Sequence, residues 1–549
     1  MTPKAKNPIQ LRQGLTIGQP AAEDDDEFLF PAFFENYAYA EMSSVSSPKF
    51  LLLGRTGTGK TAILRCIEKQ KDYVVKIDPA ELSLQYISNS DIINFFEKNG
   101  VKLDLFYQML WRHVIASELI KKFFGLDDEA KTKSFYQKIA TGFSAKRKRA
   151  IEYMQSFGSE FWMETDERIS QVTTKFEKEL KAGAGIDDTI ILGTQGSTTY
   201  SEEQTKQFAY RAQKVVDNVK LQQLSEVIDW LDADVFTDPK KQYYVLIDDL
   251  DLNFSFGDTK LWLIRALIET CKKFRKISNV KIVISIRTDL LERVFETTRD
   301  EGFQEEKYKG NICKLMWLPG ELKEIVNRRL SESIRRQYSN SNIGFSEVFP
   351  EKINQSDSFS YLVQRTLHRP RDIIAYVNEC IVQSVGSDRI SISNIKKAEE
   401  PYSYDRFNAL RDEWLSHFPL LGESSKILHG RPRKFSLSQI TKDDIEMIML
   451  ELATNDKHDQ DRLASKIPSS GNFKRSDINK FKIELVYCLY RTGIVGLKLK
   501  PESKLNWSHI DSVYISREDI SEDTTIYPHP MLWRKLSINT KEFDSEIQP

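Results

Sequence analysis

The stretch that decides the fold of this chain is Lys49-Phe50-Leu51-Leu52-Leu53-Gly54-Arg55-Thr56-Gly57-Thr58-Gly59-Lys60-Thr61, and the helical pattern Ala62-Ile63-Leu64-Arg65-Cys66-Ile67 follows it. An apolar run, the spacing G-x-x-x-x-G-K-T and a helix form the strand–loop–helix setting of a phosphate-binding loop. Glycines let the backbone curl until its amides point inward and hold a polyphosphate, to which the helix presents its positive end. The sequence therefore predicts that residues 54–61 bind a nucleoside triphosphate.

The chemistry of the loop assigns a part to its individual positions. The predicted nucleotide-binding residues are Gly54, Arg55, Thr56, Gly57, Thr58, Gly59, Lys60 and Thr61. Lys60 is expected to reach the β and γ phosphates, and the Thr61 hydroxyl is expected to bind Mg²⁺. The expected ligands are therefore ATP and Mg²⁺; adenine is an assumption, because nothing resembling a guanine-reading motif stands out.

A second apolar strand ends in acidic residues, in the run Tyr244-Val245-Leu246-Ile247-Asp248-Asp249-Leu250-Asp251. The carboxyl end of such a strand faces the ligand crevice of an α/β sheet. Asp248 is expected to hold Mg²⁺ through water, and Asp249 to orient or deprotonate the attacking water. The alternative is a buried strand that simply ends in solvated aspartates.

Two arginines complete the predicted site. Arg287 closes the apolar strand 280–286, where its cation is placed to sit beside the γ-phosphate or to anchor the acidic residues. Arg371 lies in the run Arg369-Pro370-Arg371-Asp372 at the start of a helix, since proline suits a first helical turn, and is expected to reach the nucleotide from a mobile lid. For each arginine the alternative is an ordinary surface ion pair.

The order of strand and helix patterns predicts an α/β fold, a P-loop NTPase with a parallel, helix-covered sheet. The expected strands are 49–54, 73–78, 243–247, 280–286 and 312–318. The long stretch between the second and the third has helical periodicity, with one helix expected at 161–180, and predicts a large helical insertion. A helix is also expected at 359–385.

The chain of 549 residues is long enough for about three or four domains. The predicted segments are a flexible tail at 1–27, the first part of the NTPase core at 28–120, the helical insertion at 121–239, the second part of the core at 240–320, a helical lid at 321–400 and a winged-helix-like domain at 401–549. The last of these rests on helices near 442–454, 459–466 and 476–491 and on strands at 494–499 and 512–516.

The composition excludes several classes of protein. It is 40% hydrophobic and 29% charged, which is typical of a globular chain. No run approaches the ~18 apolar residues of a membrane span, and the start lacks a signal-peptide core, so we expect a cytoplasmic protein without membrane contact. The five cysteines lie far apart and indicate reduced core residues. The net charge of −1 gives no global attraction for nucleic acid, although a local basic face is compatible with it.

The loop, the D-D-x-D strand end, the arginine after the next strand and the R-P-R-D helix together resemble the STAND and KAP side of the P-loop ATPases. The chain looks closer still to a bacterial group of ATPases associated with mobile elements and phage defence. The shared segments are Ala22-Glu23-Asp24, Leu110-Trp111-Arg112-His113 and His529-Pro530-Met531-Leu532. The resemblance spans roughly residues 22–536.

The resemblance implies an ATP-dependent switch that hydrolyses ATP slowly and signals through its own oligomer or an effector protein, in antiviral defence. The chain departs from these families in lacking the membrane helices of KAP proteins and the sensor repeats of STAND proteins, and in having Asp249 where a glutamate is usual. No arginine finger is identifiable, since nothing selects between Arg265 and Arg275.

Two alternatives remain open from the sequence. One is a DNA-handling ATPase of the origin-recognition or transposition-regulator type, which would use the C-terminal winged helix. The other is a nucleotide-locked structural subunit with negligible turnover.

Overall fold

The computed structural model describes residues 10–79, 90–126, 165–185, 202–217, 221–250, 258–299, 304–338, 343–468, 473–510 and 515–540. The chain divides into two compact units. The sheet unit comprises Glu35–Arg55 and Lys60–Leu315, and the helical unit comprises Met1–Phe34, Thr56–Gly59 and Met316–Pro549. Among the described helices, none is both long and apolar enough to cross a membrane.

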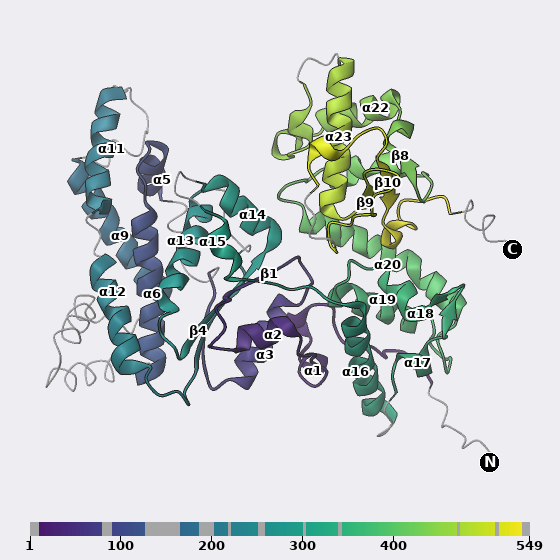
Figure 1. Cartoon of the computed structure of the whole chain (residues 1–549), viewed down its shortest axis with the longest axis horizontal. Coiled ribbons are helices and arrows are strands. Elements are labelled where there is room, and N and C mark those ends of the chain that lie inside the picture. The colour runs from purple at the N-terminus through teal and green to yellow at the C-terminus, as the bar shows by residue number, and fades with distance from the viewer. Residues whose placement is uncertain are drawn as a thin grey trace. The chain divides into compact units, whose positions relative to one another are not determined.

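The sheet unit is built on five parallel strands in the order β2-β3-β4-β1-β5 (Figure 1). The strands are β1 (Leu51–Gly54), β2 (Tyr73–Ile77), β3 (Tyr243–Ile247), β4 (Val280–Arg287) and β5 (Ile312–Lys314). They are mainly apolar because helices bury them, as is usual for parallel sheets, although β2 and β4 each include a lysine, Lys76 and Lys281. The predicted parallel α/β sheet is therefore confirmed, although β5 ends earlier than its apolar run.

Helices surround this sheet and extend from it. Those of the sheet unit are α2 (Tyr37–Ser43), α3 (Lys60–Gln70), α5 (Asp91–Lys98), α6 (Asp104–Phe124), α9 (Thr165–Ala184), α11 (Glu202–Asp217), α12 (Leu221–Trp230), α13 (Asp258–Phe274), α14 (Thr288–Thr297) and α15 (Glu306–Lys309). In Figure 1, α6, α9, α11 and α12 lie side by side. The predicted helix at 161–180 corresponds to α9, although residues 161–164 lie outside the described ranges.

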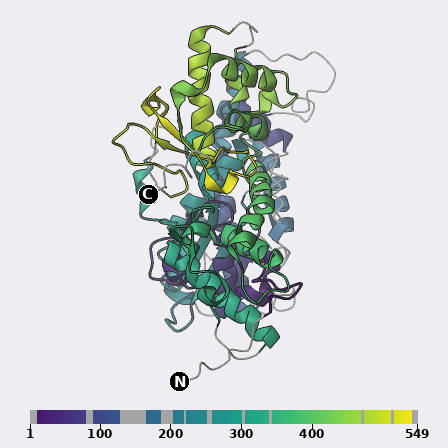
Figure 2. The ribbon, with the colours of Figure 1, turned by 90° about the vertical axis from the view of Figure 1, so that its right-hand side faces the viewer.

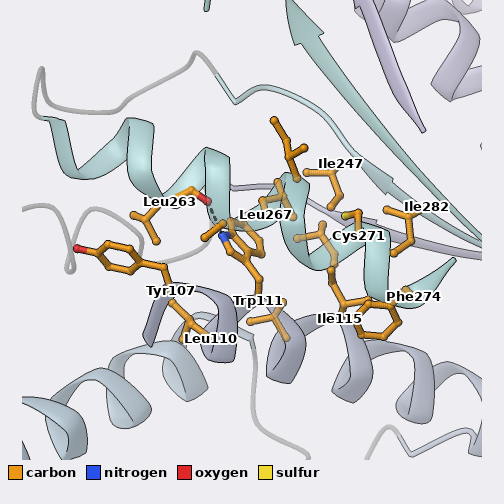
Figure 3. Packing of buried hydrophobic residues seen from close by; sticks show 14 of the residues in the cluster. Tyr107, Leu110, Trp111, Ile115, Ile247, Leu263, Leu267, Cys271, Phe274 and Ile282 are labelled. Carbon is orange, nitrogen blue, oxygen red and sulfur yellow. Dashed lines mark hydrogen bonds between the residues drawn. The ribbon is translucent and has the colours of Figure 1, made fainter. Parts of the chain in front are cut away.

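Part of the core of the sheet unit lies between α6 and α13. Trp111 of α6 is 1% exposed and donates from its indole Nε1 to the carbonyl oxygen of Leu263 at 2.9 Å (Figure 3). Ile115 of α6 and Ile282 of β4 are also buried in the same cluster. The buried indole nitrogen thus has the partner that its desolvation requires.

The helical unit begins with a segment that packs on helices far away in the sequence. Leu11, Leu15 and Ile17 are buried, and the Ile17 backbone nitrogen donates to the Asn378 side-chain oxygen at 2.9 Å. Asp25 forms an ion pair of 2.6 Å with Arg329. Residues 10–27 are thus folded, unlike the flexible tail that their polar composition predicts.

Most of the helical unit is α-helical. Its elements are α1 (Asp26–Leu29), α16 (Pro319–Tyr338), α17 (Phe345–Val348), α18 (Ser358–Val363), α19 (Pro370–Val382), α20 (Ile392–Glu413), α21 (Leu421–Ser424), α22 (Lys442–Ala453) and α23 (Arg475–Thr492), with a hairpin of β6 (Lys352–Ile353) and β7 (Ser356–Asp357). The single helix expected at 359–385 is wrong, because the chain turns at His368, whose φ is 50°. Pro370 then opens α19 at its first turn.

The C-terminal part carries a small antiparallel sheet in the order β8-β10-β9, from β8 (Phe435–Ser436), β9 (Val495–Lys498) and β10 (Thr525–Pro528). Figure 2 shows α23 in yellow-green with yellow strands beside it. The α-helix expected at 459–466 is wrong: this segment forms two short 3-10 turns. Most of the strand expected at 512–516 lies outside the described residues, and β10 was not predicted.

Candidate phosphate-binding site

The loop after β1 has the predicted strand–loop–helix form. β1 ends at Gly54 and α3 begins at Lys60. Gly57 and Gly59 have φ angles of 76° and 94°, in the left-handed region that glycine adopts without steric cost. The Lys60 ammonium donates to the carbonyl oxygens of Gly54 at 3.1 Å and Arg55 at 3.2 Å. The lysine therefore folds back over its own loop.

We call Gly54, Arg55, Lys60 and Thr61 the stem of the loop, and Thr56–Gly59 its tip. The stem belongs to the sheet unit and the tip to the helical unit.

The other predicted residues of the sheet unit lie at the carboxyl edge of the same sheet as the stem. Gly54 of β1 pairs with Arg287 of β4, and Ile247 of β3 pairs with Ile284 of β4. Asp248 follows β3 directly and is half-buried. Because all these strands are parallel and β4 lies between β1 and β3, the stem, Arg287 and Asp248 share one edge of the sheet, where α/β proteins bind ligands.

Asp249 has an unusual backbone conformation. Its φ is 55°, in the left-handed region that few residues other than glycine adopt, although aspartate does so more readily than most. Non-glycine residues held in this region concentrate at functional sites. Asp251, the last acidic residue of the motif, lies outside the described residues.

Arg287 is engaged with a neighbour in its own chain segment. Its Nε donates to Asp289 Oδ1 at 3.0 Å and its Nη2 donates to Asp289 Oδ2 at 2.9 Å. The two side chains are 17% and 13% exposed. This fork is the ion pair that the sequence offered as the alternative to a phosphate contact.

The tip of the loop is held by three hydrogen-bond donors of the helical unit. Arg369 Nη1 donates to the carbonyl oxygen of Thr56 at 2.5 Å. The backbone nitrogen of Arg371 donates to the carbonyl oxygen of Gly57 at 3.3 Å. Trp317 Nε1 donates to the carbonyl oxygen of Thr58 at 2.7 Å. Three successive carbonyl groups of the tip therefore have partners from β5–α16 or from the start of α19.

Arg369 is the centre of a buried charge cluster. Its Nε lies 2.9 Å from Asp372, its Nη1 lies 2.9 Å from Glu413, and Arg406 lies 3.4 Å from Asp372. Burial opposes the charge of Arg369, but the two carboxylates raise its pKa above the ordinary value. Burial likewise opposes the charge of Asp372, and Arg369 and Arg406 hold the pKa of that carboxyl below its usual value. The four charges thus compensate one another inside the helical unit.

Arg371, the lid residue expected at the nucleotide, lies across the tip. A Cβ added to Gly57 would come within 2.9 Å of Arg371 Cβ and Cδ, so the two residues are in close contact. The Arg371 Nε donates to the carbonyl oxygen of Pro20 at 3.4 Å. Burial, followed by the charge of Arg369, lowers the pKa of Arg371. The geometry puts this arginine at the loop, although its side chain is directed to the N-terminal segment.

Sequence reasoning missed Arg369 and Trp317 as residues of this site. Both had weak signals: Arg369 stands in the R-P-R-D motif, and Trp317 is the last residue but one of the apolar run before Pro319. Their partners lie 313 and 259 residues away in the chain, so no local pattern identified the contacts.

Comparison with known proteins gives two findings. Residues 320–411 match the model of the FunZ-associated C-terminal helical domain, from the start of α16 almost to the end of α20. The chain is also 19% identical over 302 residues to an Escherichia coli K12 protein described as putative transposon gamma-delta 80.3 kDa protein. This alignment covers 54% of the chain but 40% of that relative, so the chain spans less than half of the relative's length. The chain is thus similar to a transposon-associated protein, and its α16–α20 region to the FunZ-associated helical domain.

Proposed function

We propose that this protein is a Mg²⁺-dependent ATPase that works as a slow molecular switch. The observation that carries the proposal is the loop at residues 54–61, which follows β1 at the same edge of the sheet that bears Asp248. Left-handed Gly57 and Gly59 support a phosphate nest, because such turns expose successive amide groups to an anion. The function follows from the chemistry of these residues.

Each predicted residue has a role in this proposal. Lys60 leaves the carbonyls of its own stem and binds the β and γ phosphates, while Thr61 and Asp248 hold Mg²⁺. Asp249 orients the attacking water. Arg287 exchanges Asp289 for the γ-phosphate, and Arg371 serves as the lid residue beside the tip. Binding and loss of the γ-phosphate then set two states of the protein.

The biological setting rests on resemblance. The loop, the acidic strand end and the R-P-R-D helix resemble the STAND and KAP ATPases, and we assign the chain to bacterial antiviral defence by that likeness. The signal passes through an oligomer of the chain or an effector protein, in the cytoplasm and without a membrane anchor. The similarity to the Escherichia coli protein described as a putative transposon protein supports a role linked to mobile elements.

The test measures ATP turnover and binding by purified wild-type protein and the Lys60→Ala variant. Lys69→Ala, which removes an exposed lysine from the same helix α3, is the matched control. Loss of the phosphate-binding ammonium should lower turnover by roughly 100-fold or more, whereas the control should match wild type. Equal turnover by wild type and Lys60→Ala would exclude this site as the centre of ATP hydrolysis.

A second function, DNA handling, is favoured by one finding: the relative in Escherichia coli is described as a transposon protein. The small sheet β8-β10-β9 beside α23 would then be the DNA-binding module, as in a winged helix. Turnover with and without plasmid DNA, with size-exclusion light scattering on the same samples, separates the two functions. Stimulation by DNA that Lys60→Ala abolishes favours the DNA-handling ATPase, and DNA-indifferent turnover with ATP-dependent assembly favours the switch.

A further inference from the structure

The three carbonyl contacts of the tip have a directional consequence. A peptide bond is planar and trans, so its C=O and the N–H of the next residue point in opposite directions. The anchored carbonyls belong to Thr56, Gly57 and Thr58. Each donor therefore fixes the direction of the following N–H, which belongs to Gly57, Thr58 or Gly59. These three amides point away from the anchoring donors.

We propose that Arg369 and Trp317 are positioning residues that assemble the phosphate nest. Their hydrogen bonds orient the carbonyl groups of the tip away from the phosphate position, so that the amides of residues 57–59 point toward the phosphates. The left-handed φ angles of Gly57 and Gly59 are of the kind found in turns whose successive amides bind anions. The inference deepens the proposed function and rests on it, because it needs a phosphate ligand at the loop.

Arg369 is the stronger of the two anchors. Its contact with Thr56 is charge-assisted, and its guanidinium is only 2% exposed. Asp372 at the start of α19 holds its Nε, and Glu413 at the end of α20 contacts the same Nη1 that donates to Thr56. The shape of the nest therefore depends on α19 and α20 of the helical unit, and phosphate affinity should change when these helices shift.

The sharpest test replaces Trp317 with phenylalanine, which keeps an aromatic ring and removes the indole N–H together with the five-membered ring that carries it. Trp533→Phe is the matched control, because the Trp533 indole donates at 2.9 Å to the carbonyl oxygen of Pro528, away from the loop. The probes are Mg–ATP and inorganic tripolyphosphate, measured as equilibrium dissociation constants. Trp317→Phe should weaken both about 2- to 10-fold, as expected for one hydrogen bond, while Trp533→Phe leaves both unchanged.

A second pair of variants tests the charge cluster. Arg369→Lys keeps the positive charge but loses the planar guanidinium that bonds several partners at once. It should weaken tripolyphosphate binding about 10-fold and raise KM for ATP with little change in kcat. Glu413→Gln keeps an oxygen acceptor for Arg369 and should lose less than about 3-fold. A purely structural role for Arg369 would lower the thermal midpoint without moving the dissociation constants.

The outcomes distinguish this inference from the proposed function. If wild type binds Mg–ATP and Lys60→Ala does not, but Trp317→Phe and Arg369→Lys bind as tightly as wild type, the positioning role is overturned and the nucleotide site stands. If wild type and Lys60→Ala give the same binding, both proposals fail together.

Discussion

Backbone hydrogen bonds of the parallel sheet hold β1 and the residue before it, which lead into the stem of the loop, whereas two side chains and one backbone N–H of the helical unit hold the tip. The Leu53 carbonyl oxygen accepts from the Leu315 backbone nitrogen at 2.7 Å, and the Phe50 oxygen accepts from Ile284 at 2.8 Å. The tip instead depends on donors from Trp317 and Arg369, which lie 259 and 313 residues away in sequence.

This difference makes the stem the more rigid part of the loop and the tip the more adjustable part. A strand ladder is a cooperative structure with many equivalent bonds, so loss of one side chain barely changes its path. The three donors of the tip have no such redundancy, and they come from the segment between β5 and α16 and from the start of α19. We therefore expect the stem to respond to changes in the sheet, and the tip to respond to changes in α16, α19 and α20.

The largest effect is expected from Arg369→Met, which removes the central charge of the tip's anchor. Asp372 and Glu413 would then share a buried site without their common cation. Breaking a buried ion pair on one side costs about 3–5 kcal/mol, because an uncompensated charge remains. Hydrogen exchange should show lost protection in α19 and α20, with β1, β3 and β4 unchanged.

Arg328→Met is the control for this experiment. Arg328 pairs with Glu324 on the exposed surface of α16, with both side chains 42% exposed. Such pairs contribute well under about 1 kcal/mol, so the control should keep its protection pattern. Equal losses in both variants would show that the buried cluster has no special role in holding the helical unit.

The segment just before β1, which leads into the stem, has a charged support of its own, and this makes the stability of the sheet unit sensitive to pH. The Lys281 ammonium donates to the carbonyl oxygens of Ser47 at 3.0 Å and Lys49 at 2.7 Å, just before β1. Burial lowers the pKa of Lys281 to about 8, and the nearby Glu41 offsets only part of this. Below that pH the folded state carries a buried charge, and above it the charge is lost while the unfolded lysine stays protonated up to about pH 10.5.

Stability of the wild type should therefore rise, relative to Lys281→Met, as the pH increases from about 8 to about 10.5. A depressed lysine pKa means that the unfolded chain binds more protons in this window, so the free energy of unfolding increases with pH. The expected gain is about 2–4 kcal/mol at 1.36 kcal/mol per pKa unit. Thermal denaturation across this range measures it, and Lys76→Met, an exposed lysine of β2, should run parallel to wild type.

The contrast between stem and tip also explains how far the sequence predicted this structure. The strand at 243–247 was predicted with its observed bounds, because a continuous apolar run between polar segments indicates a buried parallel strand. The strand–loop–helix form around residues 54–61 was also predicted from a local pattern, since the glycines, the lysine and the threonine lie in one short motif. Local patterns are enough where local backbone geometry makes the contacts.

The errors fall where contacts come from distant residues. The helix expected at 459–466 is interrupted at Asp461, whose buried carboxylate accepts from the backbone nitrogens of Leu420, Leu463 and Ala464. The N-terminal segment looks polar, but Leu11, Leu15 and Ile17 are buried. The backbone nitrogens of Leu11 and Ile17 donate to Ser387 and Asn378, more than 300 residues later. Arg369 and Trp317 belong to the same class, since their acceptors are carbonyl groups that no residue pattern reveals.

The smallest effect is expected from Gly57→Ala, which tests the tip without touching a charge. Alanine at a φ of 76° costs about 1 kcal/mol from the left-handed conformation alone. Its Cβ would also lie 2.9 Å from Arg371 Cβ and Cδ, so one of the two residues must move. We expect about 1–2 kcal/mol lower stability of the helical unit and several-fold weaker tripolyphosphate binding.

Gly14→Ala separates the two causes, because Gly14 has a φ of 82° but no atom within 4 Å of an added Cβ. It belongs to the same unit and carries the conformational cost without the collision, so the difference between the two variants measures the contact with Arg371 alone. If Gly57→Ala loses no more stability than Gly14→Ala and binds tripolyphosphate normally, the tip moves away from α19 at little cost. The distinction between the stem and a tip fixed by the helical unit would then fail, because the tip, like the stem, would not depend on the donors of α19.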